Sequence, residues 1–232
     1  MMLTRRAEDV SEHGDRPLPP GELGPYLDDL ERLNAWFGGY ALSLRAIRKI
    51  TGRAGARRRI VIADIGGARG GLATRLIRDA RRRGRAIKVV VVDRDAASLA
   101  AGRRAAEPHL DIAWLQADAG ALPLRDGAVD VATMSLTLHH LDPESAVVAL
   151  GEMRRATRAG VVVNDLLRTW IGYALVWLAT RLFARHPFSR DDGPLSVRRA
   201  YSADELRQLA SRAGLRLVIR RHPVLARLTA YA

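Results

Sequence analysis

Three aspartates, Asp64, Asp93 and Asp118, each follow a short apolar run that is typical of a buried strand. In a parallel sheet the carboxyl ends of the strands lie along one edge, and ligands bind in the crevice beside that edge. We therefore expect the three carboxylates to lie on one rim. Carboxylates placed there could bind an ammonium group, the hydroxyls of a ribose and the edge of a base.

A glycine-rich turn follows the first of these strands and contains Gly66, Gly67, Gly70 and Gly71. Glycines allow the backbone to approach a ligand closely. The spacing Gly66-x-Ala68-x-x-Gly71 also fits the fingerprint of NAD enzymes. However, a carboxylate at Asp64 would repel a pyrophosphate, which binds to free backbone N–H groups at a helix N-terminus. A ligand that carries a positive ammonium group is therefore favoured over NAD.

The segment ADIGGARGG resembles motif I of the class I S-adenosylmethionine (SAM) methyltransferases, in which a strand is followed by Asp-x-Gly-x-Gly-x-Gly. Ala68 stands where the middle glycine is usual. The resemblance covers about residues 59–160, and it implies SAM as the cofactor. It also implies that Asp64 faces the methionine ammonium, that Asp93 accepts from the ribose hydroxyls and that Arg94 lies against the adenine. The full set of expected cofactor-binding residues is Asp64, Gly66, Gly67, Gly70, Asp93, Arg94, Asp118, Ala119 and Ser135.

A narrower resemblance rests on the stretches SLTLHHLDPES and DDGPLSVRRAYSADEL. These are similar to bacterial small-molecule methyltransferases associated with type III polyketide synthases, within the wider ubiquinone and menaquinone methylase-like family. This resemblance implies a small lipophilic acceptor that is phenolic, quinol-like or polyketide-derived, with methylation on oxygen favoured over carbon. Two alternatives stay open: an RNA or protein methyltransferase that uses the basic surface, and a SAM-fold subunit that supports a partner.

Two adjacent histidines, His139 and His140, follow the predicted strand 129–134 and fall on the same rim. A phenol with a pKa near 10 is about three units from ionised at neutral pH, which corresponds to roughly 4 kcal/mol. A positioned histidine could act as the general base, with an effect of about 10²–10⁴-fold. A cap on the next helix is the competing role. Asn164 and Asp165, at the end of the next strand, are rival substrate contacts, and no histidine spacing indicates a metal site.

Apolar runs that alternate with helical patterns predict an α/β fold with a Rossmann-like, doubly wound sheet of seven strands. The sheet is expected to be mostly parallel with an antiparallel last strand, and to carry an N-terminal and an inserted helical lid. The predicted strands are residues 60–63, 88–92, 110–115, 129–134, 160–163, 215–220 and 225–231.

The polar, proline-containing residues 1–24 are predicted to be a disordered arm. Residues 25–55 are predicted to form a helical lid, with a linker at 51–59. The SAM-binding domain is expected at 56–232, with an apolar helical insertion at about 166–200 in which residues 186–199 form an irregular loop. We expect Trp36 and Trp177 to line the substrate pocket.

The apolar segment 170–183 is too short to cross a membrane, because fourteen helical residues extend about 21 Å and the hydrocarbon core is about 30 Å thick. An interfacial helix, giving peripheral membrane contact, or a homodimer interface are alternatives to the lid. The net charge of +13 invites a nucleic-acid partner, but the arginines are scattered and this partner is not favoured. Without cysteine or an N-terminal apolar segment, the chain is expected to be cytoplasmic.

Overall fold

The computed structural model describes residue 3 and residues 5–19, 21–52, 58–108 and 110–232. Within these residues the strands form one sheet with the order β3-β2-β1-β4-β5-β7-β6. Strands β1 to β5 are parallel, whereas β7 runs antiparallel to both β5 and β6. The predicted seven-stranded Rossmann-like fold is confirmed. The strands are β1 (Ile60–Ile65), β2 (Ile87–Asp93), β3 (Ile112–Gln116), β4 (Val129–Ser135), β5 (Thr157–Leu166), β6 (Val218–His222) and β7 (Arg227–Tyr231).

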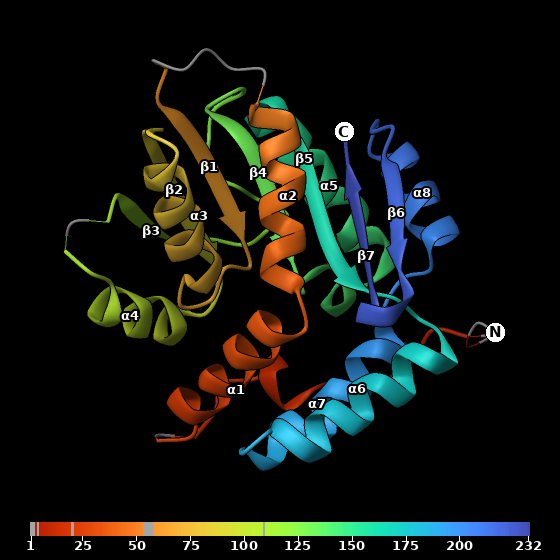
Figure 1. The fold of residues 1–232 in the computed structure, drawn as a ribbon. Helices are drawn as coiled ribbons and strands as arrows, with labels where there is room; N and C mark the ends of the chain where they lie inside the picture. The colour runs from red at the N-terminus through yellow and green to blue at the C-terminus, as the bar shows by residue number, and fades with distance from the viewer. Residues whose placement is uncertain (1–2, 4, 20, 53–57, 109) are drawn as a thin grey trace.

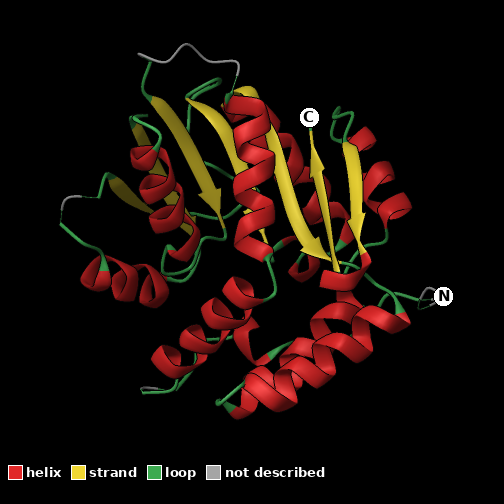
Figure 2. Cartoon of the chain, viewed as in Figure 1, coloured by secondary structure: helices red, strands yellow, loops and turns green. Residues whose placement is uncertain are grey.

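Helices cover both faces of this sheet (Figure 2). Helices α2 and α3 lie on the face toward the viewer in Figure 1, and α5 and α8 lie behind the sheet. The helices of the described residues are η1 (His13–Asp15), α1 (Leu23–Trp36), α2 (Gly39–Thr51), α3 (Gly71–Arg82), α4 (Ala96–Ala105), η2 (Leu138–His140), α5 (Pro143–Ala156), α6 (Trp170–Phe183), α7 (Pro187–Arg199), α8 (Ala203–Arg212) and η3 (Pro223–Leu225).

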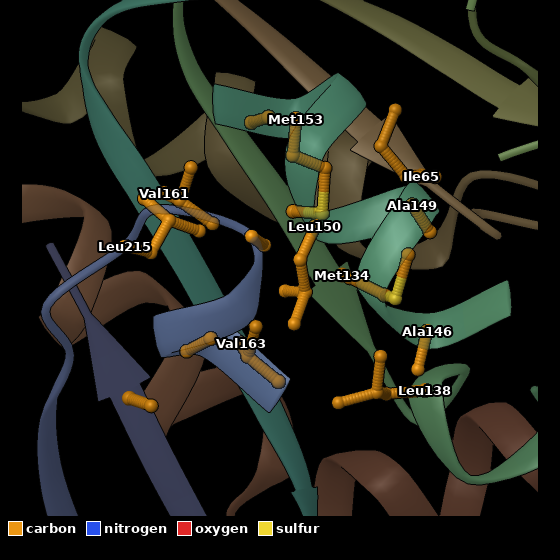
Figure 3. Packing of buried hydrophobic residues seen from close by; sticks show 14 of the residues in the cluster. Ile65, Met134, Leu138, Ala146, Ala149, Leu150, Met153, Val161, Val163 and Leu215 are labelled. Atoms are coloured by element: carbon orange, nitrogen blue, oxygen red, sulfur yellow. The ribbon is translucent and has the colours of Figure 1, made fainter. Parts of the chain in front are cut away.

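The hydrophobic core lies in two layers, one on each face of the sheet. Behind the sheet, Met134 of β4 packs against Leu150 and Met153 of α5, and all three side chains are buried (Figure 3). Each such side chain contributes about 1.5–3 kcal/mol by leaving water. Because the core holds β1, β4 and β5 rigidly, the residues that follow these strands keep fixed positions.

Helices α1, α6 and α7 form a layer of their own, here called the cover helices. They lie at the end of the sheet toward which the arrows of β1 and β5 point (Figure 1). Asp29 of α1 is buried and accepts hydrogen bonds of 2.7 Å from the backbone N–H groups of both Arg185 and His186. This carboxylate therefore fixes the junction between α6 and α7 to α1.

The prediction of an irregular loop at residues 186–199 is wrong, because this segment is helix α7. Gly193 and Pro194 are strong turn signals in a sequence, but both lie inside the helix. A Cβ atom at Gly193 would lie 2.5 Å from Thr180 Cγ2, so the glycine allows α7 to pack closely on α6. Packing against α6 outweighs the low local helix propensity.

The N-terminal segment also differs from the prediction of a disordered arm over residues 1–24. In its described part, the Ala7 N–H donates to the Arg198 carbonyl at 3.0 Å, and Arg6 donates to carbonyl oxygens that include that of Leu141, at 2.8 Å. Glu12 is buried. The segment buries little apolar surface, so its composition resembles a disordered tail, but its polar groups find partners on η2 and α7. The predicted linker at 51–59 lies largely outside the described residues.

Candidate active site

A cavity of about 660 Å³ lies between the carboxyl ends of the central strands and the cover helices. Its strand side is lined by Asp64, Asp93 and Asp118, which the sequence predicted on one rim. Its opposite side is apolar and includes Leu27 of α1 and Val176 of α6. One cavity thus joins a carboxylate-lined half to an apolar half.

Asp64 lies one residue before the end of β1, is 1% exposed, and has an Oδ2 atom without a hydrogen-bond partner among the described residues. Burial, and then the negative charge of Asp93, raise the pKa of Asp64 to about 7. A buried carboxylate without a partner is costly, and a cationic ligand group would offset that cost. The site is therefore suited to an ammonium group at Asp64.

The glycine turn lies directly against this carboxylate. The N–H groups of Gly66 and Gly67 donate to the Val92 carbonyl at 2.8 and 3.1 Å, which holds the turn beside β2. A Cβ atom at Gly66 would lie 2.3 Å from Thr137 Cγ2, and one at Gly67 would lie 2.9 Å from Asp64 Oδ2. Any larger residue at these two positions would fill the cradle.

Asp93 is held by two backbone N–H groups. Its Oδ2 accepts from Ala68 at 2.8 Å and its Oδ1 accepts from Asp95 at 2.9 Å. Each oxygen has a second lone pair, so the carboxylate can still accept from two hydroxyl groups. Ala68, at the position where the motif has its middle glycine, adopts a left-handed backbone with φ of 46°.

The other expected cofactor residues differ in their placement. Ala119, Arg94 and Ser135 line the cavity, and Arg94 also donates to the Asp15 carbonyl at 3.0 Å. Asp118 is exposed and its Oδ1 accepts from the Gly120 N–H at 2.7 Å. Gly70 lies outside the residues that line the cavity.

Gly70 instead has a structural role at the start of α3. It is the N-cap residue, with a left-handed φ of 78°. A Cβ atom there would lie 2.7 Å from Trp114 Cη2, so a side chain would be strained as well as crowded.

The two histidines lie on η2, and both line the cavity. The Nδ1 atom of His139 lies 2.7 Å from Asp165 Oδ1, and that of His140 lies 2.6 Å from Asp15 Oδ1. Their Nε2 atoms face the carboxylate of Glu12, at 3.7 Å for His139 and 3.9 Å for His140. Two histidines and Glu12 thus converge beside the cavity.

Glu12 is fixed by other partners. Its Oε2 accepts from Ser196 Oγ at 2.7 Å and its Oε1 accepts from Arg199 Nη1 at 3.1 Å. Burial raises the pKa of Glu12, and the charges of His140 and Arg199 oppose that rise only in part. For Asp15, burial alone would raise the pKa, but the hydrogen bond and charge of His140 hold it well below its ordinary value.

Sequence reasoning missed Glu12, Asp15 and Arg199. Glu12 and Asp15 lie in a polar segment without periodicity, more than 120 positions before the histidines. Arg199 is one of many arginines and lies in the segment predicted to be a loop. No local signal distinguishes these three residues.

Asn164 and Asp165 are buried and lie outside the residues that line the cavity. The Asn164 side-chain amide donates to the Gly39 carbonyl at 2.7 Å and to Ser43 Oγ at 2.8 Å, which joins β5 to α2. Asp165 holds His139. In the structure both residues make positioning contacts, and their contact with a substrate stays a prediction.

Trp36 and Trp177, predicted to line the pocket, are 60% and 44% exposed and lie outside its lining. The wall that α6 contributes comes from Val176, Ala179 and Thr180. In a helix the residue after an inward-facing one is rotated by about 100°, which places Trp177 on the outer face. The aromatic character of these two residues predicted a pocket, whereas in the structure both side chains are exposed and lie outside the cavity lining.

Residues 62–160 match the family model described as "Methyltransferase domain". The search among curated proteins gives no match. Solved structures share the fold. A SAM-dependent methyltransferase from Aquifex aeolicus has a TM-score of 0.56 and 20% identity, covering 80% of this chain and 87% of its own.

Two further structures are similar over most of both chains. The plantazolicin methyltransferase BamL, solved with a desmethyl-plantazolicin analogue and S-adenosylhomocysteine (SAH), has a TM-score of 0.66 and 12% identity, covering 91% of this chain and 90% of its own. The magnesium protoporphyrin IX methyltransferase of Synechocystis PCC 6803, solved with SAH, has a TM-score of 0.59 and 13% identity, covering 88% and 92%.

The domain match, the fold and the site agree, and the predictions of a methyltransferase enzyme and of SAM as its cofactor are confirmed. The residues present fit this cofactor on two observations. The buried Asp64 Oδ2 lacks a partner, and the cradle at Gly66 and Gly67 would be filled by a Cβ atom.

Proposed function

We propose that this chain methylates a hydroxyl group of a small, lipophilic, phenolic or quinol-like acceptor, with a polyketide-derived phenol as the leading class. One observation carries the proposal: the 660 Å³ cavity runs from the Asp64 rim to an apolar wall and passes His139 and His140. A cavity of this size suits a cofactor portion and a small acceptor. BamL and the magnesium protoporphyrin IX enzyme, similar in fold, carry names of small-molecule methyltransferases.

In this proposal Asp64 binds the cofactor ammonium and Asp93 accepts from the ribose hydroxyls. The N–H groups of the glycine turn are engaged with β2, so the turn supplies space and shape more than free donors. Asp118 and Ala119 lie at the far end of the rim, where the adenine edge would be read.

When bound, SAM supplies an electrophilic methyl group on a sulfonium centre. Methylation of a hydroxyl group would also require its proton to leave to a base of the chain. His139 and His140 are the imidazoles on the cavity lining, and we assign the activation of the acceptor hydroxyl to this pair. Asp165 acts as a positioning residue because it holds the Nδ1 side of His139.

The apolar half excludes water and selects the acceptor. Its walls come from both α1 and α6. They include Leu27, Leu30, Leu33, Phe37, Leu175, Val176 and Ala179. A nucleic-acid site would require arginines and exposed aromatic rings on this surface, which disfavours RNA as the acceptor.

The outer face of α6 serves a different purpose in this proposal. It exposes Trp170, Ile171, Trp177, Leu178 and Leu182. Within the described part of the chain, no helix has the length and apolar character to cross a membrane. Exposed Arg181 and Arg185 flank this face at its end. We assign it to peripheral contact with an anionic membrane surface, where a lipophilic acceptor would be concentrated.

The test is incubation of the purified chain with isotopically methyl-labelled SAM and three acceptor pools: a panel of phenols and quinols, total RNA, and a protein extract. We expect label in the phenols and quinols, on oxygen. Label confined to RNA or protein would overturn the proposal in favour of the macromolecular alternative. If SAH binds and no pool is labelled, the result would overturn the proposal in favour of a SAM-fold subunit that supports a partner.

A further inference from the structure

Glu12, His139 and His140 present one carboxylate and two imidazoles whose potential ligand atoms all lie within 4.8 Å of one another. All three residues line the cavity on the side of the cover helices. We propose that they bind a divalent first-row transition-metal ion. No local pattern in the sequence predicts this site, because Glu12 lies more than 120 residues before the two histidines.

The first argument is the orientation of the two rings. Asp165 lies at Nδ1 of His139, at 2.7 Å, and Asp15 lies at Nδ1 of His140, at 2.6 Å. A carboxylate at Nδ1 fixes the tautomer that carries the proton there, which leaves the Nε2 lone pair free. Metal-binding histidines almost always have such a partner on the other ring nitrogen. Both Nε2 atoms face Glu12, so the two lone pairs and the carboxylate converge.

The second argument is charge. With neutral histidines, the network holds two more carboxylates than guanidinium groups. Its members in direct side-chain contact are Glu12, Asp15 and Asp165 as carboxylates, and Arg199 as the guanidinium. A divalent cation would balance this excess of two negative charges. Protonation of both histidines would balance it equally, and the experiment below separates the two cases.

The third argument is the geometry and the ligand type. Ligands of a first-row ion lie about 2.0–2.2 Å from it, which places neighbouring ligand atoms about 3–3.6 Å apart. The Nε2 atom of His139 lies 3.7 Å from Glu12 Oε1, that of His140 lies 3.9 Å from Oε2, and all the ligand atoms lie within 4.8 Å of one another, so the three side chains must close in around the ion. Two imidazoles and one carboxylate suit zinc, iron, cobalt or nickel, whereas magnesium and calcium prefer oxygen ligands.

The ion would leave coordination positions open toward the cavity, because all three ligands lie on its lining. An acceptor oxygen placed there would lose its proton more easily, as water does on a bound metal ion. This role deepens the activation assigned to the histidines and rests on the proposed function. Metal binding itself does not, so it is measured without SAM or acceptor.

The experiment uses the full chain, freed of metal by a chelator, and titrates it with Zn²⁺ by calorimetry and with Co²⁺ by visible absorption. We expect one ion per chain and, for Co²⁺, the absorption bands of a site with nitrogen ligands. Glu12→Gln and His140→Gln should each weaken binding at least tenfold. His222→Gln, which removes an imidazole on β6, should leave it unchanged. In all variants the Kd for SAH should stay within twofold of that of the unchanged chain, which shows that the variants are folded.

Asp15→Asn provides a variant that keeps all three ligands. By weakening the support of the His140 ring it should lower the affinity about tenfold, within the range seen for such partners. Absence of one-to-one binding tighter than about 100 µM, or binding that Glu12→Gln and His140→Gln leave unchanged, would overturn the metal site. The network would then be an ion-pair network with protonated histidines. Tight binding without any metal effect on methyl transfer supports the site and overturns its role toward the acceptor.

Discussion

Asp165 fixes His139 through both of its oxygens: Oδ1 lies 2.7 Å from the ring Nδ1 and Oδ2 accepts from the His139 backbone N–H at 3.1 Å. Asp165 lies one residue before the end of β5, and His139 belongs to η2, which follows β4. The pair therefore ties neighbouring strand ends together and sets the direction in which the imidazole faces the cavity. Burial alone would raise the pKa of Asp165, but the charge and hydrogen bond of His139 hold it below its ordinary value.

Asp165→Asn should reduce methyl transfer more than cofactor binding. An amide can accept at one atom only, so the ring loses part of its support and its preferred tautomer. We expect kcat to fall by about 10²-fold or more, within the range of general-base effects, with the Kd for SAH within twofold. Steady-state kinetics and calorimetry test this. Equal losses in both quantities would show that Asp165 acts on the fold alone.

Cofactor binding should depend on pH through Asp64. Its pKa of about 7 means that the carboxylate is protonated below that pH in the free chain. Only the charged form attracts an ammonium group, so lowering the pH from 8 to 6 should weaken SAH binding roughly tenfold. Calorimetric titrations at several pH values test this. An affinity that is flat over this range would mean that Asp64 does not meet the ammonium.

Asp64→Asn should stabilise the chain in the absence of cofactor, while abolishing cofactor binding. The pKa of Asp64 is raised from 3.8 to about 7 on folding. The buried charged carboxylate therefore destabilises the folded chain fully above pH 7 and not at all below pH 4. At pH 8 the variant should gain up to about 4 kcal/mol in the free energy of unfolding, and at pH 4 almost nothing. Denaturant unfolding at the two pH values measures this difference; a variant less stable at pH 8 contradicts it.

Asp93→Ala should weaken SAH binding by removing two charge-assisted hydrogen bonds worth roughly 1.5–3 kcal/mol each. The variant also removes the acceptor that holds the Ala68 N–H. We expect a loss of at least 100-fold in affinity. Asp126→Ala, a change of the same kind at the exposed turn before β4, is the control and should bind normally. If the two variants bind alike, Asp93 does not contact the ribose.

Val176 lines the cavity and its neighbour Trp177 on α6 is exposed, so arginine at each position tests the two faces of the helix separately. Val176→Arg places a charge in the apolar half of the cavity and should abolish turnover of hydrophobic acceptors with SAH binding retained. Trp177→Arg changes the exposed face and should leave turnover of a dissolved acceptor within twofold.

The same pair tests the surface assigned to membrane contact. Trp177→Arg should reduce binding to phosphatidylglycerol vesicles, measured by co-sedimentation, and Val176→Arg should not. Unchanged sedimentation of Trp177→Arg, together with a shift from dimer to monomer in light scattering, would identify the face as a homodimer interface instead. If Trp177→Arg loses turnover of a dissolved acceptor, the result would support the prediction that Trp177 lines the substrate pocket.

The sequence by itself predicted the strands, a mostly parallel sheet and the placement of Asp64, Asp93 and Asp118 on one rim. These predictions depend on short-range information. Buried strands appear as apolar runs, a glycine turn needs glycines at fixed offsets, and parallel strands necessarily bring their carboxyl ends to one edge.

Only the tertiary structure placed Glu12 against the histidines, turned residues 187–199 into a helix and set Trp177 on the outside of α6. Each outcome depends on a partner distant in the chain: Glu12 on Arg199 and Ser196, and α7 on the close approach of Gly193 to α6. The sequence around a polar residue has no periodicity that would predict which side chain it contacts. The energy that places it comes from pairwise contacts that exist only after the elements have packed.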